Sequence, residues 1–146
     1  MRVVRGCPFP DDRGYHADYN VWLQKTAEGR LTLGATSYGV ARAVEFFAFM
    51  PKPLGTAVEA GRAVGLLELA KTVVSVRTPV SGVVVEVNVE AVARPKLIAE
   101  DPYGTGWLVR LESDPVAIQQ APLLWGDQVI AAFEAEMSME DRKSTR

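Results

Sequence analysis

The sequence predicts a mainly β protein, a flattened barrel-sandwich hybrid with short helices and a C-terminal helix. Its apolar and β-branched runs are short and are separated by turns that contain Gly or Pro, which is typical of short strands. Gly-bounded short strands stand on both sides of Lys71, as expected for a barrel flattened from two related halves. An amphipathic stripe begins only after Asp127, which places a longer helix at the C-terminal end.

The length and composition indicate one globular domain. A chain of 146 residues can bury a core without disulfides or metals. We expect a single domain over residues 1–146, with a barrel core at about 15–112 and a helical extension at about 113–140. The formal charge of −2, with Lys and Arg scattered along the chain, predicts no nucleic-acid partner.

No segment of the sequence suggests a membrane or a secreted protein. No apolar run approaches the length of a membrane span, so we expect no membrane partner. Arg2 and Arg5 are not followed by the apolar region of a secretory signal, so the expected location is cytoplasmic.

Residues that commonly carry catalysis are scarce. Cys7 is the single cysteine, so no internal disulfide is possible, and His16 is the single histidine. No Cys, His or carboxylate group shows metal-ligand spacing, so we expect no metal site. His16 has no visible catalytic partner and is expected to be a polar surface or edge residue. With no nucleophile–base pair and no acid–base carboxylate pair, the sequence predicts a protein that is not an enzyme.

The first part of the chain is expected to contain short strands. Residues 1–14 are rich in Pro, Asp, Arg and Gly and are expected to wrap the surface, with Val3–Val4 as an edge strand. Asn20–Gln24 alternates, so that Trp22 lies on the opposite face from its two aliphatic neighbours. The chain returns as a second strand at Leu31–Leu33.

A short helix and an aromatic strand follow. Thr36 is a suitable N-cap for a helix over Ser37–Val44. Glu45–Met50 is expected to be a strand that ends at Pro51, because proline removes a ladder hydrogen bond. Aromatic residues bury large areas, so three side chains of this strand are expected in the core: Phe46, Phe47 and Phe49.

The centre of the chain is a run of three predicted strands. Val64–Ala70 and Thr72–Arg77 are apolar and β-branched, and Gly82–Val87 follows a Pro-Val-Ser-Gly turn. Lys71 stands between the first two strands, so it is expected at the tip of a hairpin, although no Gly, Asn or Pro is beside it. Most exposed lysines only solvate a surface. The chain has other lysines without this setting: Lys25, Lys52, Lys96 and Lys143.

Two short helices and a closing strand are expected next. Asn88 can cap a helix over Val89–Ala93, and the preceding proline can open another over Lys96–Ala99. A turn over Asp101–Gly106 then leads to a strand over Trp107–Leu111.

The C-terminal part is expected to be helical. Asp114–Gln120 predicts about one helical turn, and Asp127 can cap a helix that runs to about Met139. The apolar stripe of this helix is expected to pack on the barrel. It consists of Val129, Ile130, Phe133 and Met137.

Two motifs of the chain resemble a known family. Glu68–Lys71 reads Glu-Leu-Ala-Lys, Pro79–Gly82 reads Pro-Val-Ser-Gly, and Asp101–Trp107 reads Asp-Pro-Tyr-Gly-Thr-Gly-Trp. Together they resemble the glycine cleavage system H protein, whose lipoyl-lysine hairpin reads Glu-Ser-Val-Lys and then Ser-Pro-Val/Ile-Ser-Gly. The resemblance covers about residues 15–112 and implies the flattened fold of lipoyl and biotinyl carriers.

The resemblance implies lipoic acid covalently bound to Lys71 as lipoyl-lysine, with Glu68 recognised by the enzyme that attaches it. It also implies two partners: a lipoate ligase or lipoyl transferase, and a dihydrolipoamide dehydrogenase. Biotin is the competing modification, but biotinyl hairpins resemble Ala/Met-Met-Lys-Met, whereas Lys71 stands between Ala70 and Thr72. The Asp-Lys-Ala of the lipoyl domains in 2-oxo acid dehydrogenases is also absent.

The sequence departs from the family pattern around the predicted arm. Asn20–Leu23 keeps the Trp of the first strand but lacks its His-Glu, and Ala43–Glu45 stands where the family has Leu-Gly-Asp. Ala48–Gly55 replaces Val-Glu-Leu-Pro-Glu-Val-Gly, so acidic residues become apolar, Lys or Pro. Such changes of charge and shape alter which partners a surface accepts.

This divergent pattern most resembles the lipoate-binding proteins of the heterodisulfide-reductase-like sulfur-oxidation system. That resemblance implies a lipoyl carrier whose arm shuttles sulfur intermediates or electrons, with the heterodisulfide-reductase-like complex as a partner. The alternative is a glycine cleavage system H protein that carries an aminomethyl group. A third alternative is an unmodified interaction protein on the same fold, which an intact mass would separate from the other two.

Overall fold

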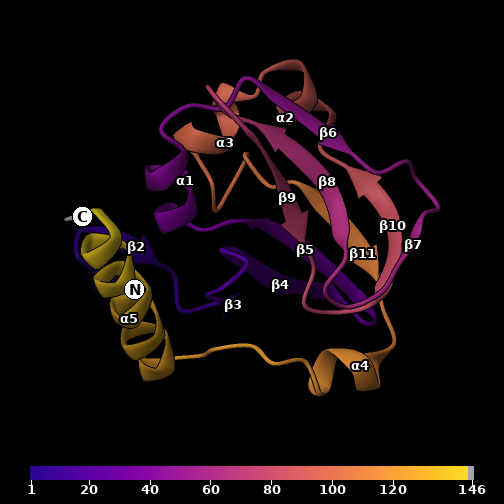
Figure 1. Cartoon of the computed structure of the whole chain (residues 1–146). Coiled ribbons are helices and arrows are strands. Elements are labelled where there is room, and N and C mark those ends of the chain that lie inside the picture. Colours follow the sequence, from indigo (N-terminus) through magenta and orange to yellow (C-terminus); the bar gives the residue numbers. More distant parts are fainter. Residues whose placement is uncertain (145–146) are drawn as a thin grey trace.

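The structure is a computed structural model that describes residues 1–144, with side chains described up to Asp141 (Figure 1). The described strands form three sheets. The first is a hairpin of β1 (Arg2–Val4) and β2 (Cys7–Phe9). The second has six strands in the order β3 (Gly14–His16), β4 (Val21–Ala27), β5 (Arg30–Ala35), β11 (Val109–Glu112), β10 (Gly82–Val87) and β7 (Ala57–Val58). The third has three strands in the order β6 (Ala48–Pro51), β8 (Ala63–Glu68) and β9 (Val73–Arg77).

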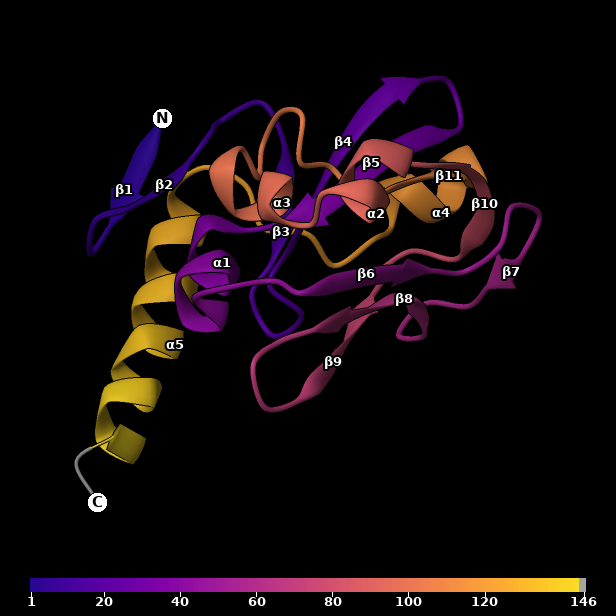
Figure 2. The same cartoon turned by 90° about the horizontal axis from the view of Figure 1, so that it is seen from above.

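The two larger sheets face each other and enclose the main core (Figure 2). Leu33 and Val84 of the six-stranded sheet are buried with Phe49, Val64 and Leu67 of the three-stranded sheet. Burial of apolar side chains between two sheets is the main source of stability in a sandwich. The predicted mainly β class is therefore confirmed.

The sandwich is open, so the predicted barrel-sandwich hybrid does not close into a barrel. The strand ladders among the described residues run within each sheet, and none of them joins the three-stranded sheet to the six-stranded one. At one edge, β6 ends at Pro51, whose nitrogen carries no hydrogen for a further strand. At the other edge, β9 pairs with β8 alone.

The strand β4 is buried on both of its faces. Val21 and Leu23 point into the main core, while Trp22 lies in a second cluster, which confirms the predicted alternation. Trp22 lies against Gly34 of β5, where an added Cβ would stand 2.4 Å from the indole Cζ2. Only glycine allows the indole ring to lie flat on the neighbouring strand.

The second cluster joins the two ends of the chain. Val4 and Phe9 of the β1–β2 hairpin are buried against Tyr15, Phe133 and Met137. The prediction that residues 1–14 only wrap the surface is therefore wrong. These apolar side chains are buried because the C-terminal helix crosses them, a contact between segments that are distant in sequence (Figure 1).

Short helices connect the strands, and their caps agree with the sequence. In α1 (Ser37–Ala43) the Gly39 N–H donates to the Thr36 hydroxyl at 3.0 Å, and in α2 (Val89–Ala93) the Ala91 N–H donates to the Asn88 side chain. The other two short helices are α3 (Lys96–Glu100) and α4 (Pro115–Gln119).

The C-terminal helix α5 spans Asp127–Ser144 and is longer than predicted. Asp127 is its first residue rather than its cap. Val129 and Phe133 are buried in the second cluster. The helix α5 therefore packs on the N-terminal hairpin and on the face of β4 that carries Trp22. Ile130 is exposed, which corrects its predicted place in the apolar stripe. Among the described residues, no helix has the length and hydropathy needed to cross a membrane.

The predicted aromatic strand is shorter than expected. Phe46 and Phe49 are buried in the main core, as predicted, but the strand β6 begins only at Ala48. Phe47 lies in the connection from α1 and its side chain is 52% exposed. Its predicted place in the core is therefore wrong, because successive side chains of this segment point to opposite sides, with Phe46 buried and Phe47 on the surface.

Candidate functional site

The hairpin of β8 and β9 carries Lys71 at its tip, as predicted. Glu68 pairs with Val73 as the last residues of the ladder, and the Leu69 N–H donates to the Thr72 carbonyl at 2.8 Å. The turn residues are then Ala70 and Lys71. In the described chain three residues other than glycine have positive φ, and neither turn residue is among them. The turn therefore needs no glycine, because it is not of the mirror-image type that favours Asn-Gly.

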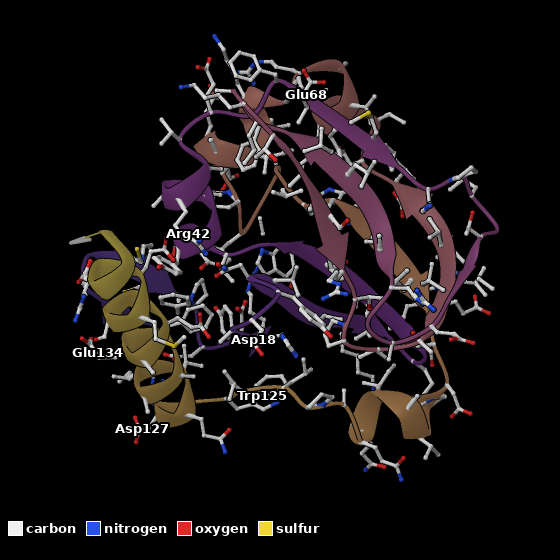
Figure 3. All side chains as sticks on the ribbon, in the orientation of Figure 1. Asp18, Arg42, Glu68, Trp125, Asp127 and Glu134 are labelled. Carbon is white, nitrogen blue, oxygen red and sulfur yellow. The ribbon has the colours of Figure 1, made fainter. Side chains whose placement is uncertain are left out.

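The Lys71 side chain is exposed and makes no hydrogen bond or ion pair with any residue that the structure describes. Glu68 is likewise exposed at the end of β8, near the upper edge of the view in Figure 3. The residues opposite Glu68 are Ala48 on β6 and Val73 on β9, neither of which carries a charge. The charges of Lys71 and Glu68 therefore remain available to another molecule.

The other end of the hairpin is held firmly. Thr78 is fully buried, and its hydroxyl both donates to the Val80 carbonyl at 2.7 Å and accepts from the Val80 N–H. The Gly61 N–H donates to the Thr78 carbonyl at 2.7 Å. At Gly82 an added Cβ would stand 2.7 Å from the Glu112 carbonyl oxygen. The Pro-Val-Ser-Gly motif thus anchors the hairpin whose tip presents Lys71.

The second motif, Asp101–Trp107, has a structural role. The Asp101 carboxylate accepts from the N–H and the hydroxyl of Thr105, both at 2.9 Å. The side-chain amide of Asn88 donates to the carbonyls of Thr105 at 2.8 Å and Trp107 at 2.7 Å. These bonds fix the turn between α3 and β11. Sequence reasoning gave Asn88 only a capping role and missed this second one.

A cavity of about 550 Å³ lies beside the hairpin, and sequence reasoning did not find it. Leu69, Thr72 and Val74 of the hairpin form one wall, while Tyr19 and residues of α1 form the other. Its lining is mostly apolar, and the lining residues come from segments far apart in the chain. No local pattern in the sequence could have indicated such a space.

Charged groups stand at the border of this cavity. Arg42 of α1 forms an ion pair with Glu140 of α5 at 3.3 Å, and both line the cavity (Figure 3). Arg77 of β9 lies over the ring of Tyr19, with its guanidinium carbon 5.3 Å from the ring centroid. The C-terminal helix therefore contributes to the border of the cavity as well as to the second cluster.

These features fit a lipoyl group, which the sequence resemblance implies. Acylation requires a lysine that protrudes and has no competing partner, and Lys71 meets both conditions. An acylated lysine forms a long, mostly apolar arm, and the cavity offers apolar side chains such as Leu69 and Phe46 within the same region. The residues present could therefore hold both the attachment point and the arm.

Other residues singled out by the sequence have structural surroundings. His16 lies half-buried on the edge strand β3, stacked on Tyr19 with ring centroids 3.9 Å apart, and its Nδ1 accepts from the Tyr19 N–H. Burial lowers the pKa of the His16 imidazole. Burial raises the pKa of the Cys7 thiol, which disfavours a reactive thiolate. Among the described residues, no group of three or more potential metal ligands comes together.

An exposed lysine with no partner among the described residues, on an anchored hairpin beside an apolar cavity, is the arrangement expected of a carrier protein with a prosthetic arm. Comparisons with known proteins then give the family. Residues 13–136 match the family described as "Glycine cleavage H-protein". This chain therefore belongs to the glycine cleavage H-protein family.

Individual relatives agree with this assignment. The "Glycine cleavage system H protein 2" of Aquifex aeolicus is 34% identical over 141 residues, which is 97% of this chain and 88% of that protein. The "Glycine cleavage system H protein" of Thermobifida fusca is 35% identical over 127 residues, covering 87% of this chain and 97% of that protein. The crystal structure of a glycine cleavage system H protein from Mycobacterium marinum superposes with a TM-score of 0.72 at 34% identity, covering 82% of this chain and 94% of the other.

Proposed function

We propose that the chain is a lipoyl carrier rather than an enzyme, with lipoic acid attached to Lys71, and that it serves the glycine cleavage system. The observation that carries this proposal is the free, exposed Lys71 at the tip of an anchored hairpin. Membership of the H-protein family supports the same reading. The names of the relatives support the glycine cleavage system as the setting, and the sequence resemblance implies an aminomethyl group as the cargo.

The attachment step is an acyl transfer to the Lys71 amine. The ammonium group loses a proton, and the amine then attacks the carboxyl carbon of lipoyl-adenylate. An amide bond forms, AMP leaves, and a second proton is released. The product carries no charge at Lys71, which lowers the cost of moving the side chain into an apolar site.

The chain and the cofactor have separate chemical roles. Once attached, the lipoyl group supplies a dithiolane that exchanges electrons and transferable groups, so the protein needs no reactive cysteine of its own. The anchored hairpin holds the attachment point in place, and Leu69 and Val74 can contact the arm within the cavity and exclude water from it. We assign Glu68 to recognition by a lipoate ligase or lipoyl transferase. A dihydrolipoamide dehydrogenase is the proposed partner that reoxidises the arm.

A second candidate is a carrier for the heterodisulfide-reductase-like sulfur-oxidation system. The observation that favours it is the surface beside the hairpin, where Val44 and Phe47 are exposed. The family pattern has Gly at the first of these positions and acidic residues shortly after the second. An altered docking surface favours an altered partner. A cytoplasmic location is proposed for either function.

Glycine–bicarbonate exchange separates the two candidates. The lipoylated chain replaces H protein in an assay with glycine decarboxylase, and a Lys71→Arg variant serves as the control. Exchange near the rate of an H protein supports the glycine cleavage function. Lack of exchange, together with normal reduction of the oxidised arm by dihydrolipoamide dehydrogenase run in reverse with NADH, would contradict it and support the sulfur-oxidation candidate.

A further inference from the structure

Three apolar side chains are exposed on the β8–β9 hairpin and on the connection that precedes β6, and we call them the tip patch. They are Val44, Phe47 and Val73, whose exposed fractions are 82%, 52% and 51%. Single exposed apolar residues are common on proteins and need no explanation. Several of them gathered around one functional group indicate an interaction surface.

Backbone pairing brings the tip patch together. The Phe47 N–H donates to the Glu68 carbonyl at 2.8 Å, and Val73 stands opposite Glu68 on the other side of β8. Val44 precedes Phe47 by three residues in the short connection from α1 to β6 (Figure 1). Phe47 and Val73 therefore flank the strand end from which the Lys71 turn emerges, and Val44 lies in the connection that leads to Phe47.

Val44 adopts a strained conformation. Its φ of 67° and ψ of −56° form a γ-turn, closed by the Glu45 N–H donating to the Ala43 carbonyl at 2.8 Å. This turn with positive φ is rare and unfavourable for a β-branched residue. Burial does not offset the strain, because Val44 is 82% exposed. Strain of this kind that brings no packing is a mark of a functional surface.

The charges around the tip patch are of both signs, because Lys71 follows Glu68 by three residues and Lys96 of α3 lines a small pocket with Val44 and Glu45. Glu45 and Glu68 border it, and neither forms an ion pair with a residue that the structure describes. Lys71 is the cation nearest in sequence to Glu68. A complementary partner surface would be apolar and would carry basic side chains to face the two carboxylates.

We propose that the tip patch is the docking surface for the enzyme that acylates Lys71, an inference that rests on the proposed lipoylation. An unmodified lysine side chain has a stem of only four carbons. The active site that acylates it must therefore contact the residues around the turn. An enzyme that receives the long acylated arm can stand further away, so the patch fits the acylating enzyme best.

The test measures kcat/KM of a lipoate ligase, with lipoate and ATP, for the unmodified chain and its variants. Phe47→Ser and Val44→Gly each remove an apolar side chain of the patch, and glycine adopts the Val44 backbone without strain. Val116→Ser on α4 is the matched control, because this valine is 56% exposed away from the hairpin. Both patch variants are expected to lower kcat/KM by about tenfold or more, which is typical of removing a central interface contact. The control is expected to stay within about twofold of the parent.

Val44→Gly gives a second readout that a merely structural role would not produce. It is expected to raise the Tm, because it relieves the strain, while it lowers the acylation rate. Patch variants acylated at the parent rate would overturn the docking surface, and so would an equal loss in Val116→Ser. The docking surface would also be overturned if the patch variants are acylated normally but fail to transfer groups to an enzyme that receives the lipoyl arm. A dimer of the parent chain that the patch variants abolish would overturn it as well. If the parent chain is not acylated at Lys71, the proposed function itself fails, which is a different result.

Discussion

Gly82 begins β10, shortly after the β8–β9 hairpin, and its replacement tests how the base of that hairpin is anchored. It pairs with Val58 in the six-stranded sheet and lies against the end of β11. An added Cβ would stand 2.5 Å from the Ser113 hydroxyl and 2.7 Å from the Glu112 carbonyl oxygen. Gly82 is not among the glycines with positive φ, so close approach alone requires glycine here.

The size of the effect follows from which atoms must move. The Ser113 hydroxyl can rotate away, but the Glu112 carbonyl belongs to the backbone of β11 and can shift only with its strand. Overpacking of this kind typically costs about 1–3 kcal/mol. For a chain of 146 residues each kcal/mol corresponds to about 2–4 °C in Tm, so Gly82→Ala is expected to lower the Tm by roughly 2–12 °C. Gly82→Val should cost more than Gly82→Ala.

The assay is urea unfolding followed by circular dichroism, with a thermal melt as a second measurement. Ser81→Ala is the matched control, because Ser81 is the exposed neighbour of Gly82 and its change is expected to stay within about 0.5 kcal/mol. A Gly82→Ala variant as stable as this control would show that β10 and β11 can separate freely. The account of an anchored hairpin would then be refuted.

Four further changes test other parts of the structure. Lys71→Ala should leave the unfolding free energy within about 0.5 kcal/mol of the parent, because the side chain is exposed and unpaired; a large drop in Tm would mean that Lys71 supports the fold. Val44→Gly should stabilise by about 0.5–2 kcal/mol in urea unfolding, as strain relief exceeds the added backbone entropy; destabilisation would contradict the strained turn. Thr78→Val should cost about 1–3 kcal/mol, because the Val80 N–H loses its acceptor; an unchanged urea midpoint would contradict this. His16 is half-buried, which lowers its pKa below the usual 6.5, so stability should fall as the pH drops below that value, and His16→Asn should reduce this pH dependence; an equal dependence in the variant would exclude His16 as its source.

Local features of the fold could be predicted from the sequence. Thr36 and Asn88 cap their helices as expected, because a cap depends on a few neighbouring residues. The strand Gly82–Val87 has the predicted bounds, and the strands on both sides of Lys71 differ from prediction by only a few residues. The position of Lys71 at a hairpin tip follows from this local pattern.

Features that depend on distant contacts were missed. Phe9 is buried because α5 packs against it. The exposure of Phe47 depends on the residue at which the segment after α1 begins to pair with β8. The cavity has walls from the hairpin, α1 and the segment around Tyr19, so no window of sequence contains it. The pattern of short strands predicts the flattened hybrid but does not reveal whether the sheet edges meet, and in the structure they do not. The division into a core at about 15–112 and an extension at about 113–140 stays a prediction.

The departures from the family pattern gain meaning from the structure. Val44 stands where the family has Gly, and the backbone there has the positive φ that glycine adopts easily. Valine is therefore strained at this position, whereas glycine would adopt the same backbone without strain. Sequence comparison alone shows the substitution, whereas the structure shows that its side chain is exposed beside the hairpin tip.

The most direct test of the central claim is to locate the lipoyl group by peptide mass mapping. The chain is incubated with lipoate ligase, lipoate and ATP, digested, and compared with a Lys71→Ala variant treated in the same way. The account predicts one added lipoyl group, found only on the peptide that contains Lys71, and no addition to the variant. A lipoyl group on Lys25, Lys52 or Lys96, or a variant that is still modified, would contradict it.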